Sequence, residues 1–210
     1  MKKYLLLLIV SVAFLLLSAY SYVNAVSNNL ADNVFRLHVI ANSDSEEDQN
    51  LKYKVRDSLI GYMNTLTNDM NTKDEVIEIA HEHIDDFKKI AQNVVKENGY
   101  NYEVNVEIGN FSFPTKTYGD ISFPSGFYDA LKVEIGKAEG QNWWCVMFPP
   151  LCFVDVSSGV VPEESKENLE ANLGDEEYSI ISDSEENGLT SIKFKIIEFF
   201  ENICTKLANN

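Results

Sequence analysis

Residues 140–155 read GQNWWCVMFPPLCFVD, and the interpretation of the whole chain starts from them. They include both tryptophans, two of the three cysteines and a Pro-Pro step within an almost unbroken apolar run. Such a run is typical of a buried strand or of an aromatic contact surface. Alternation along a strand would place Trp143 and Cys145 on one side and Trp144 and Val146 on the other. One strand could therefore pack into the core and also present a surface.

The cysteines allow two interpretations. Cys145 and Cys152 are the plausible local pair, and the third cysteine would stay unpaired. A tight turn at Pro149-Pro150 would bring the two thiols near the roughly 7 Å limit for bridging, so a disulfide is possible but strained. The alternative is two buried thiols that pack as small hydrophobic groups.

Alternating apolar residues predict further strands before this stretch. The segments 34–41, 102–108 and 131–135 each show the period of two that is typical of a strand. The region 113–126 is rich in aromatic and turn residues, which predicts short edge strands or ordered loops. We therefore expect a sheet assembled from segments on both sides of residue 100.

Two amphipathic helices are predicted between the first two strands. The first begins where Ser45 and Asp48 resemble a capping box, and it ends near Asn68. Thr72 and Glu75 form a second capping box, and the helix that follows ends at the next Asn-Gly pair. This order predicts an α+β fold with two layers, in which a helix pair packs on one face of an antiparallel or mixed sheet.

The C-terminal part has a different composition. Residues 157–188 are acidic and poor in apolar side chains, which predicts a mobile linker after an α+β domain at 26–156. Residues 189–210 place their apolar side chains on one face and are expected to form a C-terminal amphipathic helix. That helix would dock on the domain or bind a partner.

The N-terminus is typical of an exported protein. Lys2 and Lys3 precede an apolar segment at 4–17, and small residues up to Ala25 resemble a cleavage site, so residues 1–25 are predicted to be a signal peptide. The alternative is an uncleaved anchor. Either places the remainder outside the cytoplasm, and the net charge of −16 argues against nucleic acid and anionic lipid as partners.

The histidines limit the possible chemistry. His81 and His83 would lie about 200° apart on a helix and cannot share a metal ion, and His81 with Asp85 is typical of a solvated pair, so no metal site is expected. His83 is interpreted as a satisfied core residue. No phosphate-binding loop, nucleophile elbow or zinc motif is present in the sequence.

His38 is the main candidate for acid/base chemistry. It lies near the end of the first predicted strand, with Arg36 on the same side and Asn42 and Asp44 just beyond. The competing interpretation is structural: Asp44 and Ser45 cap the helix, and Arg36 pairs with an acid on a neighbouring strand. A Cys145–His38 nucleophile pair is a further alternative, which the sequence does not bring together.

Three blocks, the first at 35–44 leading into 48–57 and the others at 113–119 and 140–155, resemble the stage II sporulation protein R family, and the resemblance runs from about residue 33 to 156. It implies a signalling protein of endospore formers without a reaction, cofactor or small-molecule substrate of its own. Such a protein is made in the forespore and secreted into the space between the two septal membranes. There it activates a membrane-embedded aspartic protease of the mother cell, which processes pro-sigma factor E. Membrane contact would then be limited to the signal peptide and the partner.

This resemblance assigns no contact residues, so candidates come from the residue types alone. The expected partner-binding residues are Arg36, His38, Asn42, Asp44, Lys116, Tyr118, Trp143, Trp144, Pro149 and Pro150. The signalling hypothesis predicts aromatic and arginine anchors with a polar rim. The alternatives are an exported hydrolase that uses His38 and Asp44, and a thiol-redox protein that uses Cys145 or Cys152.

Overall fold

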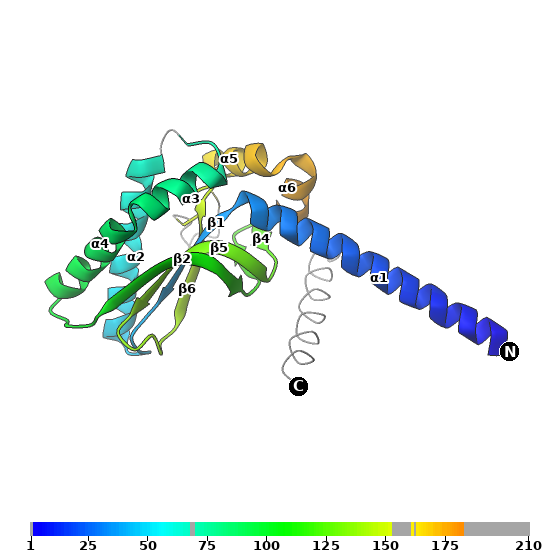
Figure 1. Ribbon diagram of the computed structural model, residues 1–210, viewed down its shortest axis with the longest axis horizontal. Coiled ribbons are helices and arrows are strands. Elements are labelled where there is room, and N and C mark those ends of the chain that lie inside the picture. The colour runs from blue at the N-terminus through cyan, green and yellow to red at the C-terminus, as the bar shows by residue number, and fades with distance from the viewer. Residues whose placement is uncertain (1, 68–69, 153–160, 162, 183–210) are drawn as a thin grey trace.

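The computed structural model describes residues 2–67, 70–152, 161 and 163–182 (Figure 1). The elements in chain order are α1 (Lys2–Asn33), β1 (Phe35–Ile40), α2 (Glu46–Thr67), α3 (Lys73–Glu82), α4 (Ile84–Glu97), β2 (Val104–Phe113), β3 (Lys116–Tyr118), β4 (Ile121–Phe123), β5 (Gly126–Ile135), β6 (Asn142–Phe148), α5 (Glu163–Leu173) and α6 (Asp175–Ser182).

The main sheet has four strands in the order β2-β5-β1-β6. β1 runs parallel to β5 and antiparallel to β6, and β2 is antiparallel to β5, so the sheet is mixed. The two short strands β3 and β4 form a separate hairpin. Figure 1 shows the helices α2, α3 and α4 along one side of the main sheet. The prediction of an α+β fold with helices packed on one face of a mixed sheet is confirmed.

The core between sheet and helices is apolar. Leu37 in β1 lies beside Leu131 in β5 and Cys145 in β6, and all three are buried. Val55 and Leu59 are buried on the inner side of α2, one turn apart as the amphipathic pattern predicts. Removing a side chain of this size from water stabilises the fold by about 1.5–3 kcal/mol.

The predicted second helix is two helices with a break at His83. The capping box of Thr72 and Glu75 is present at the start of α3, as predicted. His83 leaves helical geometry, with φ −104° and ψ 16°, and its carbonyl oxygen accepts from the backbone amides of Asp86 and Phe87. The sequence prediction of one continuous helix is therefore wrong at this single residue.

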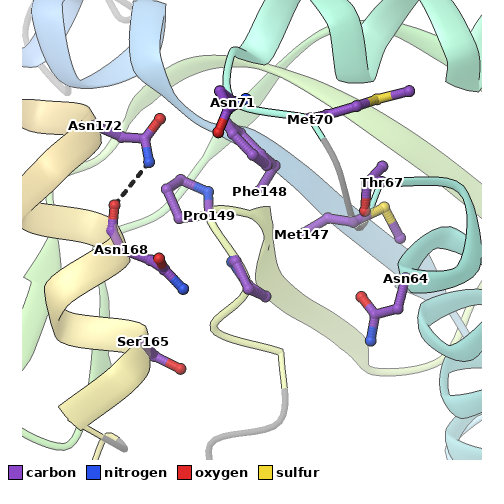
Figure 2. A pocket seen from close by; sticks show the side chains of 11 residues that line it. Asn64, Thr67, Met70, Asn71, Met147, Phe148, Pro149, Ser165, Asn168 and Asn172 are labelled. Atoms are coloured by element: carbon purple, nitrogen blue, oxygen red, sulfur yellow. Dashed lines mark hydrogen bonds between the residues drawn. The ribbon is translucent and has the colours of Figure 1, made fainter.

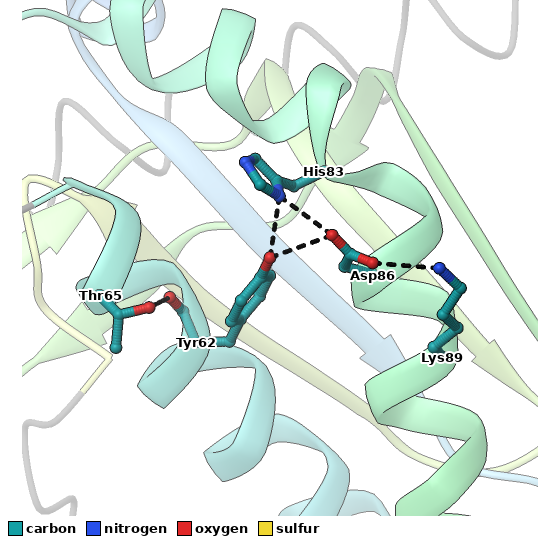
Figure 3. Close-up of polar contacts among 5 residues, drawn as sticks. All are labelled: Tyr62, Thr65, His83, Asp86 and Lys89. Atoms are coloured by element: carbon teal, nitrogen blue, oxygen red, sulfur yellow. Dashed lines mark hydrogen bonds and ion pairs between the residues drawn. The ribbon is translucent and has the colours of Figure 1, made fainter.

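Side chains hold the break in place (Figure 3). His83 Nδ1 lies 2.9 Å from Tyr62 Oη and 3.1 Å from Asp86 Oδ2, and Lys89 pairs with the same aspartate at 3.2 Å. The hydrogen bond from His83 and the pairing with Lys89 lower the pKa of Asp86. His83 is half-buried and its Nδ1 has two polar partners, which agrees with its interpretation as a structural residue at the edge of the core.

The acidic stretch 157–188 contains two helices, α5 and α6, where a mobile linker is predicted. Leu169 and Leu173, one turn apart on α5, are buried, and so is Ile181 on α6. These few apolar residues suffice because they pack against the end of α1 and against β4. The amphipathic helix predicted at 189–210 falls outside the described residues.

The last turn of α1 is part of the domain. Leu30 is fully buried, and Lys73 Nζ donates to the carbonyl oxygen of Ala31 at 2.9 Å while it pairs with Asp129 at 2.6 Å. The apolar side chains near the start of α1, such as Leu5 and Phe14, are exposed as the helix projects from the domain (Figure 1). In the described part of the chain, no helix combines the length and the apolar character that a membrane span requires. Cleavage after Ala25 stays a prediction.

Candidate functional site

The two tryptophans of β6 face opposite sides of the sheet, as alternation predicts. Trp143 pairs in register with Val39 on the helix-covered side, where its ring meets Tyr53 edge-on at 5.5 Å. Arg56 of α2 lies 4.2 Å above the same ring. Trp144 pairs with His38 on the other side of the sheet. The predicted contact residues are therefore divided between two surfaces.

Arg36 is the centre of a buried cluster on the side opposite the helices. Its side chain is 0% exposed, and its guanidinium lies 4.2 Å from the ring centre of Phe113 and 4.7 Å from that of Tyr128. Nη2 donates to Tyr118 Oη at 3.0 Å, and this hydroxyl donates to the carbonyl oxygen of Trp144 at 3.0 Å. Burial raises the pKa of Tyr118 although the arginine charge lowers it, so the hydroxyl keeps its proton.

The expected ion pair of Arg36 with an acid on a neighbouring strand is absent from the described residues. Nε and Nη1 are buried without a hydrogen-bond partner. Aromatic faces take the place of the carboxylate, because the negative face of a ring attracts a guanidinium. The interpretation of Arg36 as half of an ion pair is therefore wrong, while its expected position on the same side of the strand as His38 is observed. Tyr118 and Trp144 join them on that side.

His38 is neutral and stacked. Its ring lies 3.6 Å from the ring of Trp144 in a nearly parallel arrangement, and Nε2 lies 2.6 Å from Asn142 Oδ1. Burial lowers the pKa of His38 to about 4, against the opposite effect of the Asn142 hydrogen bond, because a charged imidazole would lose its hydration. The neutral ring donates its Nε2 proton to Asn142. Its other nitrogen is buried without a partner, so among the described residues no acid or nucleophile is hydrogen-bonded to this ring.

Asn42 and Asp44 support the turn between β5 and β6. Asn42 donates to Asp48 Oδ2 at 2.7 Å and accepts from the backbone amide of Lys137 at 3.0 Å. Asp44 Oδ1 accepts from the amide of Gln141 at 2.7 Å, so it holds the turn and leaves the capping of α2 to Ser45, which accepts from the amide of Asp48. The predicted pairing of His38 with Asp44 for acid/base work is not formed.

Two charged groups at this turn are more buried than the sequence indicates. Burial acts to raise the pKa of Asp48, but hydrogen bonds from Ser43 and Asn42 outweigh it and lower that pKa. Lys52 is 1% exposed, and its Nζ donates to the carbonyl oxygen of Gln141 at 3.0 Å. Burial lowers the pKa of Lys52 to about 8. Both side chains tie the start of α2 to the loops at this end of the sheet.

The remaining candidates lie at the other end of β6 and in the hairpin. Lys116 starts β3 opposite Phe123. Pro149 and Pro150 follow β6 and line a groove of about 460 Å³ beside α5 (Figure 2). Cys145 and Cys152 are joined by a disulfide with a Cα–Cα distance of 5.2 Å, well inside the limit for bridging. The bridge leaves neither thiol free for redox chemistry in this form.

Metal-binding groups are dispersed. The described ranges contain no set of three histidine, cysteine or acidic side chains placed to hold a metal ion. His81 is exposed on α3, and His83 turns toward Tyr62.

Comparison with known proteins identifies the family. Residues 31–158 match the family described as Stage II sporulation protein R (spore_II_R). The chain belongs to this family. A curated relative, Stage II sporulation protein R of Bacillus subtilis (strain 168), is 34% identical over 185 residues, which cover 83% of this chain and 83% of the relative. No solved structure matches. The family name denotes a sporulation protein and does not name an enzyme.

Sequence reasoning missed several members of the Arg36 cluster. Phe113, Phe123 and Tyr128 come from three different strands and surround one guanidinium. Asn142, which orients His38, was also missed. The available signal was the density of aromatic residues between 111 and 128 next to an arginine in a predicted central strand.

Proposed function

We propose that this chain is an exported signalling protein of endospore formation that activates a membrane-embedded protease by binding to it. The protein is made in the forespore and secreted into the space between forespore and mother cell. Its partner is the mother-cell aspartic protease that removes the pro-sequence of sigma factor E. Membership of the stage II sporulation protein R family is the observation that carries this proposal.

The N-terminus and the charge support export. Lys2 and Lys3 followed by an apolar segment are typical of a signal peptide, and a net charge of −16 suits a protein that stays soluble outside the cytoplasm. The exposed start of α1 fits a segment that is recognised and removed during export.

The geometry supports binding better than catalysis. His38 contacts an amide oxygen and a tryptophan ring, and Asp44 accepts from a backbone amide of the β5–β6 turn. Neither is arranged as an acid, base or nucleophile toward an open space. Tryptophan, tyrosine and arginine are the residues that dominate protein interfaces, and Trp144 and Arg56 present part of their surface. In this proposal the chain carries out no reaction of its own.

Gene deletion tests the proposal. Deletion should abolish the processing of pro-sigma factor E in the mother cell, measured by immunoblot, and the intact gene expressed in the forespore should restore it. A variant without residues 1–25 should accumulate in the forespore and fail to restore processing. Normal processing in the deletion strain would refute the signalling role. Restoration by the variant without 1–25 would refute the requirement for export.

A further inference from the structure

The groove beside Pro149 and Pro150 has two walls and an apolar floor (Figure 2). One wall is the end of α2 together with Met70 and Asn71, and the other is α5. Met147, Phe148 and Pro149 are buried below. The groove measures about 460 Å³, within the size range of ligand-binding sites.

The polar side chains that line the groove are all uncharged. They are Asn64, Thr67, Asn71, Ser165, Asn168 and Asn172. This composition is unusual for a surface of a chain in which 24% of residues are charged and the net charge is −16. A neutral groove on an acidic protein excludes ligands that depend on charge pairing and accepts neutral polar ones.

Within the described part of the chain, several of these groups have no hydrogen-bond partner. Thr67 donates to the carbonyl oxygen of Met63, and Asn172 donates to that of Asn168, so both are used within their own helices. The side chains of Asn64, Ser165 and Asn168 form no hydrogen bond with other described residues. Figure 2 shows Ser165 and Asn168 on the α5 wall and Asn64 across the groove on α2.

The chemistry of the two walls matches an extended polypeptide. A carboxamide both donates and accepts, so it can pair with a backbone N–H and a backbone C=O. An extended segment exposes such groups along both of its edges, and the amides of Asn64 and Asn168 lie on opposite walls. The apolar floor would receive one side chain of the segment.

We propose that this groove binds an extended, uncharged peptide segment of a partner protein. The identity of the partner rests on the proposed function: the segment belongs to the part of the sigma-factor-processing protease that faces the intermembrane space. Binding there places the partner between α2 and α5, at the end of β6 that carries the disulfide.

Charge substitutions test the groove without changing its shape. Asn64→Asp and Asn168→Asp replace each amide by an acid of equal size, which removes two donors and adds charge to a neutral site. Each variant should reduce processing of pro-sigma factor E at least ten-fold, while the circular dichroism spectrum and the melting temperature of the purified protein stay unchanged. Asn93→Asp is the matched control, because Asn93 is an exposed helical asparagine on α4. A strain that carries this control variant should process pro-sigma factor E normally.

Cross-linking identifies the occupant. A photoreactive amino acid at position 165 of the full-length protein should form an adduct with the protease in sporulating cells, detected with an antibody against the protease, and the same probe at position 93 should not. In vitro, overlapping synthetic peptides from the protease's extracytoplasmic segments should include one that binds the wild type and loses at least ten-fold affinity with Asn168→Asp.

The outcomes separate this inference from the proposed function. If strains with either aspartate variant process pro-sigma factor E as the wild type does, and position 165 gives no adduct, the groove is not the binding site. A processing defect in the deletion strain would still support the signalling role. Normal processing in the deletion strain overturns the signalling role. The peptide-binding assay then shows by itself whether the groove binds a peptide. Binding of a cell-wall glycan in place of any peptide also overturns the inference.

Discussion

The two sides of the central strand β1 are equally buried and chemically opposite. On the helix-covered side Leu37 and Val39 lie at 0% exposure among apolar neighbours. On the other side Arg36 is at 0% and His38 at 6%, with three of their nitrogens lacking a partner. Buried polar groups without partners cost stability, whereas buried alkyl groups supply it. One side of the strand therefore maintains the fold, and the other retains polar groups at a cost.

The largest effect is expected on the helix-covered side. Leu37→Ala should lower the free energy of unfolding by about 3 kcal/mol, because it removes buried methyl groups and leaves a cavity between α2 and the sheet. Urea unfolding of the purified protein measures it. The conservative Leu37→Met should cost less than about 1.5 kcal/mol. A loss below about 1 kcal/mol for the alanine variant would contradict the assignment of this side as the stabilising one.

A pH effect of similar size is expected from His38. Its pKa is about 4 in the folded protein and 6.5 in the unfolded chain, so the unfolded chain binds the proton first as the pH falls. The stabilising contribution is complete above pH 6.5 and declines between 6.5 and 4, by about 3 kcal/mol in total. The charges of Lys132, Glu134 and Arg36 also influence the pKa of His38. The effect is therefore measured as the difference in unfolding free energy between the wild type and a His38 variant.

The variant His38→Gln should lack this decline, and unfolding at several pH values from 7 to 4 measures the difference from the wild type. His81→Gln, at an exposed position on α3, should follow the wild type throughout. Parallel curves for the wild type and His38→Gln would show that the imidazole is readily protonated in the fold.

The smallest effect is expected from Arg36→Met. An apolar side chain of similar length fills the space among the rings and removes a buried charge, so the free energy of unfolding should stay within about 1 kcal/mol of the wild type or rise. Arg36→Ala should cost more, because it leaves a cavity between Phe113 and Tyr128. A loss of 3 kcal/mol or more in the methionine variant would mean that the guanidinium itself stabilises the sheet.

Local patterns predicted the parts of the fold that local interactions determine. The alternation of β1 and the opposite directions of Trp143 and Trp144 follow from the period of a strand. The capping box of Thr72 and Glu75 depends on residues three apart, so it is visible in the sequence. The capping box predicted at the start of α2 was only half correct, because Ser45 caps the helix while the Asp48 side chain bonds to Asn42 and Ser43.

Tertiary contacts determine what the sequence did not reveal. The break at His83 depends on Tyr62, which comes from another helix. The aromatic surroundings of Arg36 come from strands that meet only in the folded sheet. Leu169 and Leu173 lie in a stretch that looked too sparse in apolar residues for an ordered segment, and they are buried because α5 packs against α1 and α6.

The end of α1 limits where a leader could be removed from this fold. Leu30 lies inside the domain, and Lys73 donates to the carbonyl oxygen of Ala31, so these residues belong to the folded domain. If residues 1–25 are removed as predicted, residues 26–33 remain as the last two turns of α1, whereas a cut beyond Leu30 would remove part of the core. On the proposed function, the fold as well as the processing enzyme would then determine the position of the cut.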